Sequence, residues 1–236
     1  MLSITNTTRS VIFYLLFVIW TICYSIPILL IIKFITTKKR HNLLVKHWAL
    51  VSINLCRVIC GLRWKVHGQE NIPSKACVII SNHQSTWETF FLQTIITPQS
   101  LVVKRELLLI PFFGWALRAI NPIAINRSTP REAIQQVKIK GLAYLQDNVS
   151  VLVFPEGTRN QSGKLGKFSR SGALLACTSN VDILPIAHNA GKFWPGNRWI
   201  VTPGTIQVFI GHPIKTSDKD ATEANNAARE WICSKI

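Results

Sequence analysis

The pattern of hydrophobic positions divides the chain into two parts that meet near residue 65. Before that point lie two long apolar stretches, Val11–Ile32 and Trp48–Trp64. After about Gly68, short runs rich in β-branched residues alternate with longer amphipathic stretches. Such alternation implies an α/β fold with a largely parallel central sheet flanked by helices. We therefore predict an N-terminal membrane-associated helical segment over residues 1–65 and a single α/β domain over residues 66–236.

The individual elements follow from the same pattern. The expected strands are Ala76–Ser81, Ser100–Val103, Ile123–Asn126, Ser150–Phe154, Ile183–Ala187 and Thr205–Ile210. The expected helices are Ser85–Thr97, Glu106–Ala119, Pro130–Asp147, Phe168–Ser179 and Asp218–Cys233. In parallel sheets of this kind functional groups gather at the carboxyl ends of the strands. The residues that directly follow the expected strands are therefore the first place to look for chemistry.

The first apolar stretch, Val11–Ile32, has 22 residues without a charge, enough to cross a hydrocarbon layer roughly 30 Å thick. Its apolar part is too long for a cleaved signal peptide. We expect a retained anchor, with the basic residues at 38–40 and the folded domain on the cytoplasmic side of the membrane, the inner membrane if the source is a bacterium. The shorter stretch Trp48–Trp64 either lies at the interface or packs on the domain.

The charge distribution supports a membrane partner. The formal net charge is +16, and residues 1–69 contain nine Lys or Arg but no Asp or Glu. This charge indicates an anionic partner. Because the region is also the most apolar, a membrane surface is favoured over nucleic acid as that partner. No zinc pattern or basic recognition helix accompanies the charge, so we expect neither a nucleic-acid partner nor a bound metal. The six scattered cysteines are expected to be buried free thiols.

The first candidate chemistry directly follows the expected strand Ala76–Ser81. His83 and Glu88 stand five residues apart, and on one helix a rotation of about 500° would put them on different faces. Ser85 and Glu88 have the form of a capping box, so we expect a helix to begin at Ser85 and His83 to lie in the preceding turn. A carboxylate on one ring nitrogen would leave the other as a general base. Alternatively, Glu88 only caps the helix and His83 is an ordinary turn residue.

A second cluster follows the expected strand at 150–154. The block Phe154-Pro155-Glu156-Gly157-Thr158-Arg159 opens a loop that contains further glycines and basic residues. Arginine can grip a phosphate through two parallel hydrogen bonds, and glycines let backbone N–H groups approach an anion. A solvated basic loop would explain the lysines but not the Pro-Glu-Gly sequence. Arg127, after the strand expected at Ile123–Asn126, is weaker evidence, because a lone Arg there is more often a surface charge.

Taken in chain order, these blocks resemble one family, the glycerolipid acyltransferases. The shared blocks are His-x4-Asp/Glu, a strand ending in Arg, Phe-Pro-Glu-Gly-Thr-Arg, and an apolar-Pro-apolar strand, here Leu184-Pro185-Ile186. Over roughly residues 66–212 the chain looks most similar to the 1-acyl-sn-glycerol-3-phosphate acyltransferases. Many members have Asp where this chain has Glu88, a change that lengthens the reach but keeps the carboxylate.

The resemblance implies transfer of an acyl chain from acyl-CoA or acyl carrier protein to the sn-2 hydroxyl of lysophosphatidate, giving phosphatidate, without a cofactor. His83 would act as the base and Glu88 would orient it. The residues implied in acceptor-phosphate binding are Arg159, Glu156, Gly157, Thr158, Arg127 and Lys104. Three alternatives remain open: another lysophospholipid or lyso-aminolipid acceptor, a thioesterase-like hydrolase, and, supported by charge alone, a nucleic-acid-binding protein.

Overall fold

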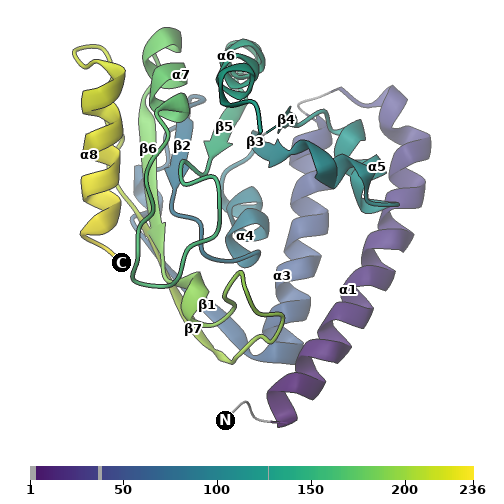
Figure 1. Cartoon of the computed structure of the whole chain (residues 1–236). Helices are drawn as coiled ribbons and strands as arrows, with labels where there is room; N and C mark the ends of the chain where they lie inside the picture. Colours follow the sequence, from purple (N-terminus) through teal and green to yellow (C-terminus); the bar gives the residue numbers. More distant parts are fainter. Residues whose placement is uncertain (1–3, 37–38, 127) are drawn as a thin grey trace.

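The computed structural model describes residues 4–36, 39–126 and 128–236, and a seven-stranded sheet runs through its middle (Figure 1). The strands are β1 (Leu62–His67), β2 (Val78–Ser81), β3 (Gln99–Lys104), β4 (Ile123–Ile125), β5 (Ser150–Val153), β6 (Ile183–His188) and β7 (Gly204–Ile210). Their order in the sheet is β1-β7-β6-β2-β5-β3-β4. Only β6 and β7 pair antiparallel among these strands, which confirms the largely parallel sheet.

Helices cover both faces of the sheet, because the central strands are apolar on both sides. Ile79 of β2 packs into a core shared with the first helical layer, whereas Val78 and Ile80 pack into a second core on the opposite face. The first layer consists of α1 (Ile4–Ile31), α3 (Lys46–Cys60) and α4 (Trp87–Ile95). The second consists of α6 (Pro130–Gln146), α7 (Ser171–Ser179) and α8 (Ala221–Cys233). The strand-helix alternation expected from the sequence is thus confirmed.

The two N-terminal helices lie side by side and pack against the α/β domain (Figure 1). The buried residues of α1 recur along one face: Ser10, Phe13, Thr21, Ser25 and Ile28. Near one end Ser10 hydrogen-bonds the backbone of Val201, and at the other Ile28 joins a cluster with Leu117 and Ile120. Because these contacts span the length of α1, the helix follows the surface of the domain. The second apolar stretch, as α3, likewise packs on the domain through α4.

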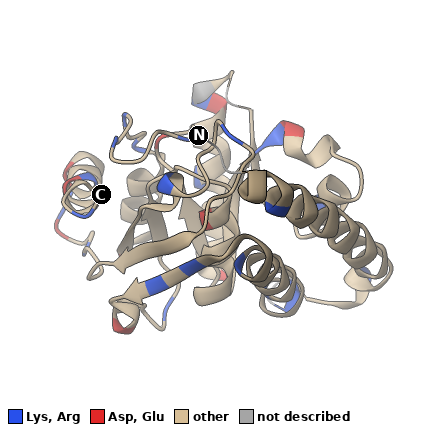
Figure 2. Ribbon diagram, turned by 90° about the horizontal axis from the view of Figure 1, so that it is seen from below, with Lys and Arg blue, Asp and Glu red and all other residues tan. Residues whose placement is uncertain are grey.

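The opposite face of these helices is apolar and exposed. In Figure 2 both helices are mostly tan, because few Lys or Arg and no Asp or Glu occur in them. By length and composition, Ile4–Phe34 and Arg40–Cys60 are both candidates for membrane insertion. The exposed apolar residues of this face include Val11, Ile12, Leu15, Leu16, Val18, Ile19, Ile26, Leu30, Leu43, Leu50 and Val58.

Three local differences from the sequence-based expectations have physical causes. Strand β1 was not expected, and it crosses the boundary proposed between residues 65 and 66. The helix expected at Glu106–Ala119 is broken into a 3-10 turn, η4 (Arg105–Leu109), and α5 (Phe113–Ala119), because Pro111 and the positive φ of Phe112 interrupt it. The other short 3-10 turns are η1 (Ile32–Phe34), η3 (Gln69–Asn71) and η5 (Ala190–Lys192), and η2 (Arg40–Val45) is a stretch of π-helix that leads directly into α3. The third difference is the start of α4, described below.

All six cysteines are free. Cys56, Cys60 and Cys77 are buried, as expected, whereas Cys23 and Cys233 are exposed. The expectation of buried thiols is therefore correct for only part of the set. Cys56 and Cys60 stand four residues apart on α3, and both are buried.

Candidate active site

The expected contact between His83 and Glu88 forms at the carboxyl end of β2. His83 Nδ1 lies 2.9 Å from Glu88 Oε1, and Glu88 is fully buried. Since a carboxylate oxygen only accepts, Nδ1 carries the proton of the neutral ring, and Nε2 is left as the nitrogen able to take a proton. The ring has 9% of its side-chain surface exposed and faces a cavity. The pair therefore has the geometry of a base held by an orienting carboxylate.

The same carboxylate oxygen also organises the turn that carries His83. The backbone N–H groups of Gln84 and Ser85 donate to Glu88 Oε1 at 2.8 and 2.7 Å. Burial acts to raise the pKa of the Glu88 carboxyl, but the two neighbouring histidines and the backbone N–H of Ser85 outweigh it and hold the pKa below its usual value. Glu88 is thus held as a carboxylate, the form that supports a protonated ring at His83.

The capping-box prediction is correct in part, because the Ser85 N–H donates to Glu88 Oε1 as expected. Helix α4 begins at Trp87, with Thr86 at the cap position, and not at Ser85. The Ser85 hydroxyl, however, accepts from the N–H of Trp87 at 3.1 Å and not from the N–H of Glu88, so the second bond of the capping box does not form. His83 nevertheless lies in the turn before α4, as expected.

Glu156 ties the two sequence blocks together. Its Oε1 accepts the backbone N–H of His83 at 2.8 Å, and its Oε2 accepts from the Asn160 side chain at 2.5 Å and the Gly166 N–H at 2.6 Å. In return, the Asn160 backbone N–H donates to the backbone carbonyl of His83 at 2.8 Å. Glu156 therefore fixes the position of the His83 backbone and of the glycine-containing loop, which is a structural role within the site.

A second buried histidine supports the His83 turn from β6. The Asn82 side chain makes two hydrogen bonds to the backbone of His188. It donates to the His188 carbonyl at 2.9 Å and accepts from the His188 N–H at 3.0 Å. The His188 Nε2 donates to the Asn82 carbonyl at 2.9 Å, while Nδ1 accepts the N–H of Ala190 at 3.3 Å. Burial lowers the pKa of His188. These bonds select a neutral ring that holds Asn82, and so His83, in place.

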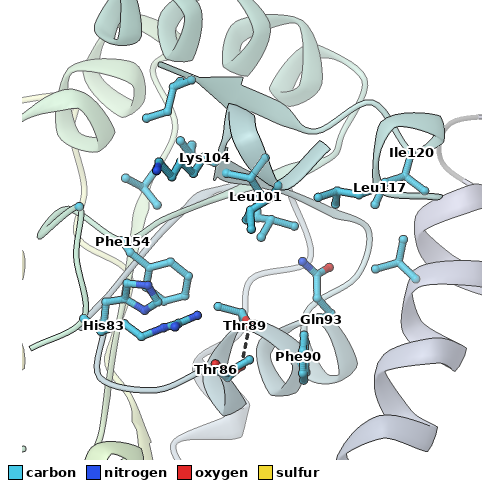
Figure 3. Close-up of a pocket in the computed structure, with 18 of the residues that line it drawn as sticks. His83, Thr86, Thr89, Phe90, Gln93, Leu101, Lys104, Leu117, Ile120 and Phe154 are labelled. Atoms are coloured by element: carbon cyan, nitrogen blue, oxygen red, sulfur yellow. Dashed lines mark hydrogen bonds between the residues drawn. The ribbon is translucent and has the colours of Figure 1, made fainter. Parts of the chain in front are cut away.

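The cavity in front of His83 has a volume of about 1050 Å³ and a mostly apolar wall. The His83 ring stacks on Phe154, with ring centroids 4.3 Å apart (Figure 3). From there the cavity extends along α4 and under β3 towards α5 and α1. Its deep part is lined by Phe90, Leu101, Leu117 and Ile120. A polar end beside His83 and an apolar interior suit a substrate with a polar head and a long hydrocarbon tail.

The predicted binding residues lie around the mouth of the same cavity. Glu156, Gly157, Thr158, Arg159 and Lys104 all line it. Arg159 is exposed, and its aliphatic stem lies against Gly196, where an added Cβ would come within 2.4 Å of the arginine Cδ. Gly157 has a φ of 67°, a conformation that glycine adopts without strain. Lys104 pairs with Glu106 at 3.2 Å, so its charge is partly compensated.

Arg127 lies outside the described residues, so its place relative to the cavity stays a prediction. Within the described ranges no group of three or more His, Cys, Asp or Glu side chains could hold a metal ion. The site therefore consists of the His83–Glu88 pair, the basic side chains at the cavity mouth, and the hydrogen bonds that join Glu156 to His83, Asn160 and Gly166, here called the Glu156 clasp.

Sequence reasoning missed several residues that build the site. Asn82 and Gln84 flank His83, and this proximity to the candidate base was their only signal. Gln84 accepts the Gly191 N–H on its side chain and the Gly196 N–H on its backbone carbonyl. His188 ends β6, the position where functional groups were expected, but the expected strand stopped at Ala187.

Comparisons with known proteins identify sequence relatives and one similar fold. The acyltransferase family profile matches residues 63–189. A 1-acyl-sn-glycerol-3-phosphate acyltransferase of Pseudomonas aeruginosa is 45% identical over 98% of this chain and 91% of its own length. One of the same name from Borreliella burgdorferi is 30% identical over 80% of this chain and 76% of its own length. The crystal structure of the 1-acyl-sn-glycerophosphate acyltransferase of Thermotoga maritima superposes with a TM-score of 0.81 over 97% of this chain and 93% of its own, at 22% identity.

Proposed function

Because the chain belongs to the 1-acyl-sn-glycerol-3-phosphate acyltransferase family of glycerolipid acyltransferases, we propose that it transfers an acyl chain from acyl-CoA or acyl carrier protein to the sn-2 hydroxyl of lysophosphatidate. The product is phosphatidate. The observation that carries the proposal is the His83–Glu88 pair, with its 2.9 Å contact at the polar end of a large apolar cavity.

The proposed reaction needs one base and two positioned substrates. The lysophosphatidate hydroxyl oxygen attacks the thioester carbonyl carbon while its proton passes to His83 Nε2. Glu88, hydrogen-bonded to Nδ1, stabilises the imidazolium that forms. The carbon–sulfur bond then breaks, and the departing thiolate recovers the proton from His83. No enzyme nucleophile and no cofactor takes part, because the acceptor supplies the nucleophile and the thiolate is a good leaving group.

Charge at the cavity mouth supports a phosphorylated acceptor. Arg159 is exposed there and can make two parallel hydrogen bonds to a phosphate. Gly157 and Thr158 precede it on the same loop, and Lys104 lies on the β3 side of the cavity. We assign the acceptor phosphate to Arg159 first, since the ion pair with Glu106 engages Lys104.

The exposed apolar face of α1 and α3 supports a site that works at a membrane. Thr21, Tyr24 and Ile28 of α1 line the cavity from one side of that helix, while residues such as Leu15 and Ile19 on its outer side are exposed. We propose that the outer face lies in the lipid of the cytoplasmic leaflet, so that lipid substrates reach the cavity past these helices. This arrangement places α1 along the membrane surface instead of across the bilayer.

The base is tested with His83→Ala. We expect the rate of acyl transfer to lysophosphatidate by the purified enzyme to fall by about 10²–10⁴-fold, the contribution of a well-placed general base. His212→Ala, which removes an exposed histidine of another loop, is the matched control and should keep the wild-type rate. Wild-type transfer by His83→Ala would refute the mechanism. Release of free fatty acid without an acceptor would indicate a thioesterase-like hydrolase instead.

The acceptor is tested with Arg159→Ala and a panel of lysolipids. We expect kcat/KM for lysophosphatidate to fall roughly 10- to 100-fold, since a hydrogen bond to a charged group is lost, while use of monoacylglycerol, which has no phosphate, changes little. Arg229→Ala on α8 removes an exposed arginine elsewhere and is the control. Equal losses for both acceptors would contradict the phosphate assignment. Faster transfer to a lysolipid with a head group would identify a different acceptor.

A further inference from the structure

One polar side chain in the apolar part of the cavity has no hydrogen-bond partner. Gln93 lies on α4 with only 5% of its surface exposed, and its Nε2 makes no hydrogen bond to any residue that the structure describes. It lines the cavity, and in Figure 3 its amide points towards Leu101 and Leu117. Thr89, one turn earlier, differs because its hydroxyl donates to the Thr86 carbonyl at 2.6 Å.

A buried amide without a partner is unfavourable, because it has given up its hydrogen bonds to water and received none in return. Of the residues labelled around it in Figure 3, Phe90, Leu101, Leu117 and Ile120 present only hydrocarbon, and the Thr89 hydroxyl is already bonded to the Thr86 carbonyl. A leucine or methionine would fill the same space at this position, so packing alone does not require an amide. The amide therefore indicates that the occupant of the cavity brings a hydrogen-bonding group to this depth.

The position of Gln93 along α4 shows which part of a substrate it meets. Thr86, Phe90 and Gln93 line the cavity from one face of α4, at spacings of four and three residues. At about 1.5 Å per residue, Gln93 is roughly 10 Å beyond Thr86 along the helix axis. His83, where the thioester carbonyl would react, adjoins the Thr86 end. An acyl chain that enters from the reactive end therefore passes Gln93 in its middle section.

We propose that Gln93 is a specificity-determining residue that selects acyl thioesters carrying a hydrogen-bond acceptor in the middle of the chain. The shared chemistry is an acceptor for the amide N–H, supplied either by a double bond, through an N–H···π contact, or by a hydroxyl group. A saturated chain at the same place leaves the amide unpaired. This inference rests on the proposed function, because it assumes that the cavity holds the acyl chain.

The test is a competition in which the purified full-length enzyme acylates lysophosphatidate from an equimolar mixture of three acyl-CoA thioesters of the same length. One chain is saturated, one has a mid-chain double bond and one has a mid-chain hydroxyl. Mass spectrometry gives the ratio of products, which does not depend on how much enzyme is folded. The variants are Gln93→Leu and Gln93→Met. Thr94→Val is the control, since Thr94 is the next residue of α4 and does not line the cavity.

We expect the wild-type enzyme and Thr94→Val to favour at least one chain with an acceptor over the saturated chain, by roughly two- to tenfold, as one neutral hydrogen bond allows. The Gln93 variants should bring that ratio close to one. Preference for the double bond, for the hydroxyl or for both identifies the acceptor. Identical ratios in wild type and both Gln93 variants, or wild-type preference for the saturated chain, would overturn the inference. A wild-type enzyme that acylates lysophosphatidate from none of these chains, whether they are offered as CoA or as acyl carrier protein thioesters, would overturn the proposed function itself, and this inference with it.

Discussion

At the residue scale, the site depends on Glu88 Oε1, which accepts from the His83 ring and from the backbone N–H groups of Gln84 and Ser85. The spacing of His83 and Glu88 required the histidine to lie outside the helix, and that expectation is confirmed by the 2.9 Å contact. The predicted capping box forms only in part: the Ser85 N–H donates to Glu88 Oε1, but the Ser85 hydroxyl accepts from the Trp87 N–H, and α4 begins at Trp87. Which N–H group the hydroxyl binds depends on the path of the turn, which no local pattern encodes. The same holds for His188, whose role arises from the pairing of β2 with β6.

Glu88 is expected to act through its charge as well as its shape. Glu88→Gln keeps an oxygen for the three donors but removes the negative charge beside the His83 ring. We expect kcat to fall by about 10²–10⁴-fold with little change in KM, because the imidazolium is no longer stabilised. Steady-state kinetics over a range of acceptor concentrations measures this. Glu88→Asp keeps the charge and should retain far more activity than Glu88→Gln; wild-type activity in Glu88→Gln would show that the charge is not needed.

At the element scale, most strands and helices of the α/β domain were predictable within a few residues, because each has a clear hydrophobic period. Strand β1 was missed because its residues Leu62–Trp64 close an apolar stretch that was assigned as one segment. Its alternation is visible only once β7 is known to pair with it, with Leu62 buried and Arg63 exposed. The break before α5 was signalled by Pro111, yet the helical period across it was stronger. Loop contacts such as the Glu156 clasp follow no hydrophobic period, so the sequence pattern does not predict them.

The Glu156 clasp is expected to be needed for both stability and activity. In Glu156→Gln one carboxylate oxygen is replaced by an NH₂ group, which cannot accept from the N–H donors of His83, Asn160 and Gly166 together. We expect a loss of about 1–3 kcal/mol, which lowers the melting temperature by roughly 2–4 °C per kcal/mol. Thermal unfolding in detergent measures it.

The same variant should also lose transfer activity below its melting temperature, because the His83 backbone is no longer fixed. Ser162→Ala changes an exposed residue of the same loop and is expected to alter neither property. A Glu156→Gln enzyme with wild-type melting temperature and rate would show that the clasp is dispensable.

At the scale of the whole molecule, the sequence predicted a membrane-associated N-terminus but not how it is attached. Hydropathy identifies apolar helices without showing what covers them. In the structure α1 is buried along one face by the domain and exposed along the other. We therefore expect the exposed face to supply the membrane affinity, with the basic residues adding attraction to anionic lipid.

Introducing charge on this face separates the two contributions. Leu15 and Ile19 are 60% and 56% exposed, so Leu15→Asp with Ile19→Asp should leave the packed face of α1 intact. Because each apolar side chain removed from lipid contact costs up to about 1.5–3 kcal/mol, the double variant should shift from the pellet to the supernatant when sedimented with vesicles of zwitterionic lipid. Its transfer rate on detergent-dispersed substrate should stay close to wild type.

The control adds the same charge elsewhere, through Ser162→Asp with Ser217→Asp on exposed loops, and is expected to sediment like the wild type. Vesicles without net charge remove the attraction of the basic residues, so that the apolar face alone is measured. If the Leu15 and Ile19 variant still sediments fully, this face of α1 does not hold the enzyme on the membrane. Attachment would then have to come from another surface, and the path by which lipid substrates reach the cavity would have to be sought there.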